Sequence, residues 1–110
     1  IDMSLWNNIQ DLRDKREIFW NSDETLFTMN IAIQNNFQTY EGILVFNKNG
    51  ELQSQIYAPA SIGLSIYGWS RDDREILYST YSLDNQAIKK LLKISVSDNG
   101  ILDENSIVTL

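Results

Sequence analysis

The sequence of 110 residues contains no cysteine and no histidine. Their absence excludes a zinc finger, a disulfide framework, thiol chemistry and a histidine-based catalytic triad within this chain. Proline occurs only once, and no apolar run approaches the roughly 20 residues that a membrane-spanning helix needs. Because a chain without cysteine is compatible with every redox compartment, the composition leaves the localisation open.

The chain is acidic, with 15 acidic and 9 basic side chains and a net charge of −6. Affinity for a phosphate backbone comes from lysine and arginine, so we expect no nucleic-acid partner. Hydrophobic residues make up 43% of the chain, which is enough for one domain with a core of its own.

Hydrophobic periodicity divides the chain into a short first segment and a long second one. We expect a short helix or linker over residues 1–16, because Trp6, Ile9 and Leu12 recur at helical spacing after Ser4, a residue type that caps helices. From residue 17 onward the apolar residues alternate or form short runs, which is typical of strands. The expected strands are 18–20, 25–33, 42–46, 52–58, 64–69, 75–81, 90–96 and 101–110.

The pattern of the first half recurs in the second half. Trp20 and Trp69 are about 50 positions apart, and so are the turns Asn49-Gly50 and Asn99-Gly100, a period typical of four-stranded propeller blades. In each half a strand ends in tryptophan and a polar turn with an aspartate follows, with one extra residue expected in the second turn.

The fold class that this repeat predicts is all-β. Two four-stranded antiparallel, blade-like units are expected over residues 17–60 and 61–110, after the N-terminal helix. A blade has two apolar faces that its neighbours cover, and this explains the uninterrupted apolar run of residues 42–46.

Four residues are expected to have structural roles in these units. Trp20 and Trp69 end the first strand of each unit, where a large ring can fill the wedge between neighbouring blades. Asp23 and Asp72 follow in the turns, where a short carboxylate accepts backbone N–H groups and stabilises the turn.

The residues around the two tryptophans resemble the repeat of TolB-type (WD-like) β-propellers. That repeat reads Trp-Ser-Pro-Asp-Gly, a basic residue and an apolar strand, and later an Asp-Gly or Asn-Gly turn. The matching segments are Trp20-Asn21-Ser22-Asp23 followed by Leu26-Phe27, and Trp69-Ser70-Arg71-Asp72-Asp73 followed by Ile76-Leu77-Tyr78. Both lack the proline before the aspartate and the glycine after it. The resemblance covers about residues 17–110 and implies a propeller fold, in a family that ranges from periplasmic scaffold proteins to domains that gate peptidases.

Two blades do not close a ring, since propellers have about 4–8 blades. The chain could therefore be part of a larger propeller, or copies could associate head to tail, with three chains supplying six blades. In the remaining arrangement the repeat is coincidental, and the chain forms a single antiparallel sheet with the N-terminal helix packed on it.

The sequence contains no recognisable catalytic, metal-binding or cofactor-binding pattern, and we expect no enzyme activity, no metal and no cofactor. The acidic pairs Asp23/Glu24, Asp72/Asp73 and Asp103/Glu104 are expected in polar turns, where solvated carboxylates do not serve as general acids. None has the spacing of a calcium loop, and no glycine-rich phosphate loop occurs.

Two groups of residues are candidates for contacts with a partner. Lys89, Lys90 and Lys93 cluster before and within one strand, where they could contact an acidic partner. We favour the alternative, an exposed strand end whose lysines discourage pairing at a sheet edge. Most aromatic residues are expected in the core, but Tyr40 and Tyr81 lie near the ends of loops and are the candidate binding residues.

Three functions fit these observations. The favoured one is a non-catalytic propeller segment that acts as a protein–protein interaction scaffold. Its partners would be a protein or further blades, or other copies of the chain if the chain is complete. The second is a propeller domain that gates a hydrolase whose catalytic part lies elsewhere. The third is a small acidic binding protein of the antitoxin or immunity type, whose negative charge steers it to a basic partner.

Overall fold

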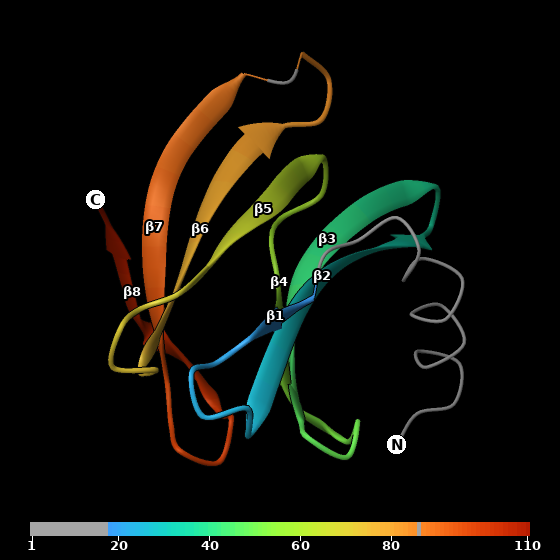
Figure 1. Ribbon diagram of the computed structural model, residues 1–110. Coiled ribbons are helices and arrows are strands. Elements are labelled where there is room, and N and C mark those ends of the chain that lie inside the picture. Colours follow the sequence, from blue (N-terminus) through green and yellow to red (C-terminus); the bar gives the residue numbers. More distant parts are fainter. Residues whose placement is uncertain (1–17, 86) are drawn as a thin grey trace.

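The computed structural model describes residues 18–85 and 87–110 and shows two four-stranded antiparallel sheets. The all-β prediction is confirmed for these residues, whereas the helix expected over residues 1–16 lies outside them (Figure 1). Sheet 1 has the strand order β1-β2-β3-β4 and sheet 2 the order β5-β6-β7-β8. The strands are β1 (Phe19–Trp20), β2 (Leu26–Asn35), β3 (Gln38–Asn47), β4 (Leu52–Tyr57), β5 (Ile62–Trp69), β6 (Glu75–Ser82), β7 (Ile88–Val96) and β8 (Leu102–Thr109).

The apolar run in β3 is buried on both faces of sheet 1. Ile43 and Val45 point to one face, Leu44 and Phe46 point to the other, and all four are 0% exposed. A strand between two covered faces needs apolar residues at every position, which is why this run shows no alternation with polar residues.

The two Asn-Gly turns close the outer hairpin of each sheet in the same way. Gly50 and Gly100 have φ angles of 82° and 85°, values that glycine adopts without a steric penalty. The Gly50 N–H donates to the Asn47 carbonyl at 3.0 Å, and the Gly100 N–H donates to the Ser97 carbonyl at 2.9 Å. The turn chemistry therefore sets the position of both hairpins locally.

The tryptophan turns of the two sheets also correspond residue by residue. Trp20 pairs with Phe27 across its turn, and Trp69 pairs with Ile76 across the other. The expectation of one extra residue in the second turn is therefore wrong. It arose from matching Leu26 with Ile76, whereas the strand register matches Phe27 with Ile76.

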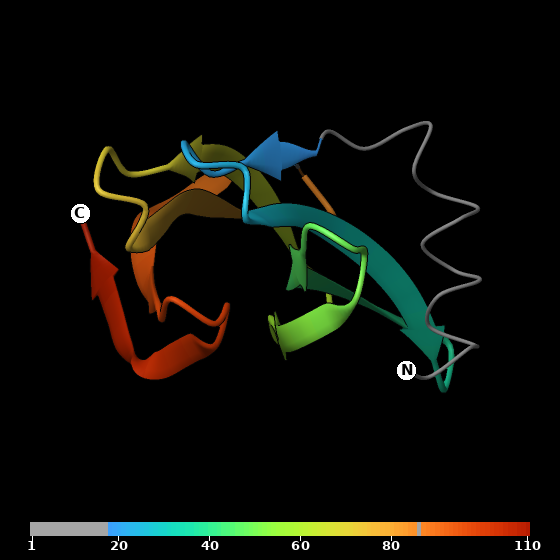
Figure 2. The ribbon, with the colours of Figure 1, turned by 60° about the horizontal axis from the view of Figure 1, so that its bottom comes forward.

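Because the pairing matches Trp20 with Trp69, it also shows which face of sheet 1 corresponds to which face of sheet 2. In each sheet, we call the face on which the tryptophan lies the tryptophan face, and the other face the opposite face. The tryptophan face of sheet 2 packs against the opposite face of sheet 1, and Figure 2 shows the two sheets curving around this shared interior. Its buried residues are Leu26, Ile43 and Val45 of sheet 1 and Leu64, Ile66, Ile76, Tyr78, Leu92, Ile94, Val96 and Leu102 of sheet 2.

A second apolar cluster lies on the tryptophan face of sheet 1. Its buried members are Met29, Ile31, Leu44 and Phe46, and Phe27, Ile33 and Leu52 pack against them. The rings of Trp20, Phe27 and Phe46 form a row across three strands, with centroids 4.9 Å apart at each step. Aromatic contacts at this separation add to the stability gained from burial alone.

Polar side chains of sheet 1 form hydrogen bonds with the free edge of β5, the edge strand of sheet 2 that lies next to sheet 1. The Asn30 Nδ2 donates to the Leu64 carbonyl at 2.8 Å, and the Leu64 N–H donates to the Glu41 Oε1 at 2.9 Å. Asn30 and Glu41 are both buried. Buried backbone groups without partners are costly, so these two side chains make the stacking of an exposed strand edge possible.

Three further hydrogen-bonded contacts join the sheets elsewhere. The Trp69 Nε1 donates to the Phe19 carbonyl at 2.9 Å, next to the paired tryptophan turns. At the other edge of the interior, the Ser54 hydroxyl donates to the Gly100 carbonyl at 2.6 Å and accepts the Leu102 N–H at 3.0 Å. Between the turns, Ser22 donates to the Asp73 carboxylate through its N–H and its hydroxyl. The relative placement of the sheets thus rests on directional contacts as well as on apolar burial.

We expect Asn30→Ala to lower the free energy of unfolding by about 1–3 kcal/mol, because it leaves the buried Leu64 carbonyl without its donor. The measurement is urea denaturation followed by tryptophan fluorescence. Asn49→Ala, in the exposed β3–β4 turn, is the matched control and should change stability by less than about 0.5 kcal/mol. Equal effects of the two substitutions would show that the contact at β5 contributes nothing.

Candidate functional site

The two tyrosines predicted to bind a partner lie on different faces of the molecule. Tyr40 is on the tryptophan face of sheet 1, paired with Ile33, and its hydroxyl donates to Gln38 Oε1 at 2.9 Å. Tyr81 is on the opposite face of sheet 2, paired with Gly63. Both are partly buried. Because the shared interior separates these faces, Tyr40 and Tyr81 do not form one site.

Tyr81 also has a packing role that its position in the sequence does not reveal. A Cβ placed on Gly63 would collide with the Tyr81 ring, and a Cβ on Gly42 would collide with the Tyr57 ring in the same way. In both sheets a tyrosine therefore covers a glycine on the neighbouring strand, an arrangement that shields the glycine backbone from water.

Exposed apolar side chains gather on the opposite face of sheet 2. Tyr67, Leu91 and Val108 are 54%, 43% and 48% exposed, and they project from three different strands. A salt bridge of 3.2 Å joins Lys93 and Glu75 on the same face. Large apolar side chains over several strands, with a paired charge among them, are typical of a protein interaction surface.

The opposite faces of the two sheets differ at one position that matters for stacking. Asn30, which bonds the edge of β5, corresponds in register to Ser79 of sheet 2. The Tyr67 hydroxyl donates to the Ser79 hydroxyl at 3.3 Å. A strand that stacks on this face of sheet 2 therefore meets no side-chain amide equivalent to the Asn30 amide that bonds β5. At that position it meets Ser79 and the Tyr67 side chain that bonds it.

Asp23 and Asp72 occupy the same place in the two tryptophan turns. Asp23 Oδ1 accepts the Thr25 hydroxyl at 2.7 Å and the Thr25 N–H at 3.3 Å. Asp72 Oδ1 accepts the Ser70 hydroxyl at 2.7 Å and the Arg74 N–H at 3.1 Å. These hydrogen bonds, the hydroxyl donors first, lower the pKa of both carboxyls below the usual value.

The other acidic residues do not gather into a site. Asp73 bonds Ser22 of the other turn, and Asp103 and Glu104 lie exposed in β8, not in the turn where they were expected. Among the described residues no group of three or more acidic side chains could hold a metal ion. The same part of the chain contains no helix long and apolar enough to cross a membrane.

The lysine cluster is only partly described. Lys93 pairs with Glu75 in the middle of sheet 2, and Lys90 is exposed on β7 next to Thr80 of β6. The side chain of Lys89 lies outside the described structure. At Lys93, β7 pairs with β6 on one side and with β8 on the other, so Lys93 does not lie at a sheet edge, contrary to the prediction. The paired residues of β7 and β8 begin at Leu92 and do not include Lys90.

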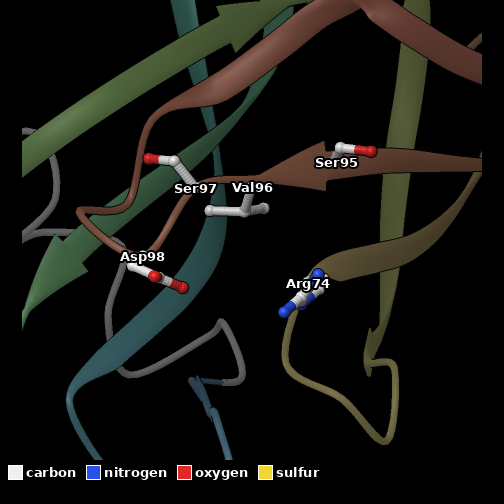
Figure 3. A pocket seen from close by; sticks show the side chains of 5 residues that line it. All are labelled: Arg74, Ser95, Val96, Ser97 and Asp98. Carbon is white, nitrogen blue, oxygen red and sulfur yellow. The ribbon is translucent and has the colours of Figure 1, made fainter.

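Two of the hollows lined by described residues are open to solvent. The first, of about 400 Å³, lies beside the β7–β8 turn and is lined by Arg74, Ser95, Val96, Ser97 and Asp98 (Figure 3). Its charged groups have opposite signs, so it does not attract ions of one sign. The second, which we call the inter-sheet crevice, has about 170 Å³ and lies between the sheets. Burial raises the pKa of the Tyr78 hydroxyl in its wall.

Phe37 is the residue that sequence reasoning missed. It is 107% exposed at the tip of the β2–β3 hairpin. Asn36 and Phe37 have φ angles of 53° and 63°, so they form the two-residue turn that normally carries Asn-Gly. The signal in the sequence is the pair Asn36-Phe37 between two strands. A two-residue turn at this place favours glycine at its second position, so phenylalanine there is unusual.

Neither a family model, nor a curated protein, nor a solved structure matches this chain. The geometry described above is therefore the whole basis for a functional proposal.

Replacing Phe37 by glycine should stabilise the protein by about 1 kcal/mol, because glycine adopts a positive φ without the clash that a Cβ causes. Thermal denaturation of both proteins measures the difference. Phe37→Ala is the control, since alanine removes the ring but keeps the Cβ and the strain. A stabilisation of the same size in both variants would mean that exposure of the ring, not backbone strain, was the source of the cost.

Asp72→Asn should lower stability at neutral pH but not in acid. The folded-state pKa of Asp72 is lowered from 3.8, so its contribution is present above the unfolded-state value and disappears as the carboxylate is protonated at lower pH. Melting temperatures at pH 7, 5 and 3 test this, and the difference from the wild type should shrink over that series. Ser70→Ala, which removes the hydroxyl donor, should produce the same trend. A pH-independent difference would contradict the role of the ionised form.

Proposed function

We propose that the chain is a non-catalytic β-propeller segment that acts as a protein–protein interaction scaffold, with each sheet as one blade. The observation that carries this is the way the sheets stack: the tryptophan face of one covers the opposite face of the other. Stacking of this kind can be extended by a further sheet, because each sheet presents one face of each kind.

The two sheets support this proposal by their equivalent construction. Both have four antiparallel strands in sequence order, a tryptophan that ends the first strand, and a glycine turn in the outer hairpin. The resemblance to TolB-type repeats rests on the same tryptophan turns. A sheet of this kind buries its apolar faces only against neighbours, so its free face is where a further sheet or a partner belongs.

That free face is the opposite face of sheet 2. Its equivalent in sheet 1 is covered by sheet 2, whereas Tyr67, Leu91 and Val108 remain exposed. The scaffold function follows from this difference, since a partner that supplies a tryptophan-type face gains the burial that sheet 2 itself gains on sheet 1.

Leu91→Lys tests the proposal in the full polypeptide and in whatever complex it forms. Leu91 and Ile101 are exposed to similar extents here, at 43% and 49%, so Ile101→Lys is the matched control. If a further sheet covers Leu91, the lysine is buried without a partner and we expect a loss of about 1–3 kcal/mol. The control should change stability by less than about 0.5 kcal/mol. If Leu91→Lys changes stability as little as Ile101→Lys does, no further sheet covers Leu91 and the scaffold proposal is wrong.

The two other predicted functions make different demands on the same protein. A domain that gates a hydrolase requires a catalytic part in the same polypeptide, recognisable by a Gly-x-Ser-x-Gly segment with its acidic and histidine partners. An acidic antitoxin or immunity protein requires a basic target, whose association rate would fall steeply with added salt.

A further inference from the structure

The tip of the β2–β3 hairpin carries an exposed aromatic ring at an energetic cost. Phe37 combines full exposure with a positive φ of 63°, and a bulky residue in that region of backbone space is a genuine outlier. Strained residues that persist on a surface indicate a function, because nothing in the folded protein repays them. Asn35 pairs with Gln38, so Phe37 lies at the tip of the hairpin, and this tip is at one end of sheet 1 (Figure 1).

The residues on either side of Phe37 in the hairpin carry no charge. Its exposed neighbours are Gln34, Asn35, Asn36 and Gln38, whose amides can accept and donate hydrogen bonds at the rim of a contact. A rigid aromatic residue surrounded by neutral polar groups has the composition of an interface hot spot, in which the ring fills a pocket and the rim excludes water.

The inter-sheet crevice is a pocket of matching chemistry on the same molecule. It is lined by Ile56, Tyr57, Ala58, Pro59, Leu64, Tyr78, Thr80 and Ile107, none of which is charged. Its volume of about 170 Å³ is smaller than the roughly 300–1,000 Å³ of small-molecule sites. A space of that size holds one large apolar side chain rather than a metabolite.

We propose that Phe37 of one copy of the chain inserts into the inter-sheet crevice of a second copy. A net charge of −6 makes copies repel one another, and the described residues of both the hairpin tip and the crevice are uncharged, so these residues bring no like charges together on contact. Phe37 is fully exposed and therefore does not fill the crevice of its own chain. Ring and crevice are different surfaces, so the association is head to tail and can propagate or close into a ring.

This contact is separate from the proposed scaffold face. It uses the hairpin tip and the crevice, whereas the scaffold proposal uses Tyr67, Leu91 and Val108 on the opposite face of sheet 2. Either proposal can therefore fail without the other.

Sedimentation equilibrium of the chain from micromolar to millimolar concentration tests the proposal. The wild type should self-associate, and Phe37→Gly should weaken the association about 30-fold or more, the effect of losing a hot-spot side chain. Ile107→Lys, which places a charge at the partly exposed rim of the crevice, should weaken it similarly. Ile101→Ser, at an exposed apolar residue outside both surfaces, should associate like the wild type.

A mixing experiment separates this contact from any other mode of association. The Phe37→Gly protein keeps an intact crevice and the Ile107→Lys protein keeps an intact ring, so an equimolar mixture should form pairs and nothing larger. Phe37→Gly is expected to fold at least as well as the wild type, so its monomeric state is informative even if Ile107→Lys fails to fold. A wild type that stays monomeric throughout, a Phe37→Gly protein that associates as tightly as the wild type, or folded variants that do not pair when mixed would each overturn the proposal.

Discussion

The structure depends on one constraint: a four-stranded sheet with two apolar faces is stable only when both are covered. Here sheet 2 covers one face of sheet 1, and the contact joins apolar burial with hydrogen bonds to a strand edge. Asn30 donates to the carbonyl of Leu64 and Glu41 accepts its N–H, and no buried side-chain nitrogen or oxygen among the described residues lacks a partner. Without those two side chains the edge of β5 would enter the interior with unpaired groups, and the apolar gain would be offset.

The same constraint explains where function is to be sought. The covered faces have a structural role, and so do the turns that contain Asp23 and Asp72 and the tyrosines that cover Gly42 and Gly63. Two places in the described structure are energetically unfavourable. The opposite face of sheet 2 leaves apolar side chains in water, and Phe37 adds backbone strain to exposure. Departures from local consistency are where natural proteins carry their functional residues.

Much of the fold could be predicted because its determinants are local. The alternation in β2, the apolar run in β3 and the Asn-Gly turns are properties of neighbouring residues, so the strands and the outer hairpins were predictable. The turn length was mispredicted because motif matching aligns residue types, whereas pairing across the sheet aligns Phe27 with Ile76. Lys93 was placed at an edge because strand order is invisible in a linear pattern. Phe37 was missed because exposure and a positive φ are properties of the folded hairpin.

By itself the sequence determined the all-β class, the duplication and the turns, since each follows from the period of apolar residues or from the φ preferences of asparagine and glycine. Only the tertiary structure decided which face of each sheet meets the other, that Tyr40 and Tyr81 lie apart, and that a crevice opens between the sheets. The physical reason is that alternation assigns side chains to two faces without saying which face is covered. That choice is made by contacts between residues distant in the chain, such as Asn30 with Leu64 and Ser54 with Gly100.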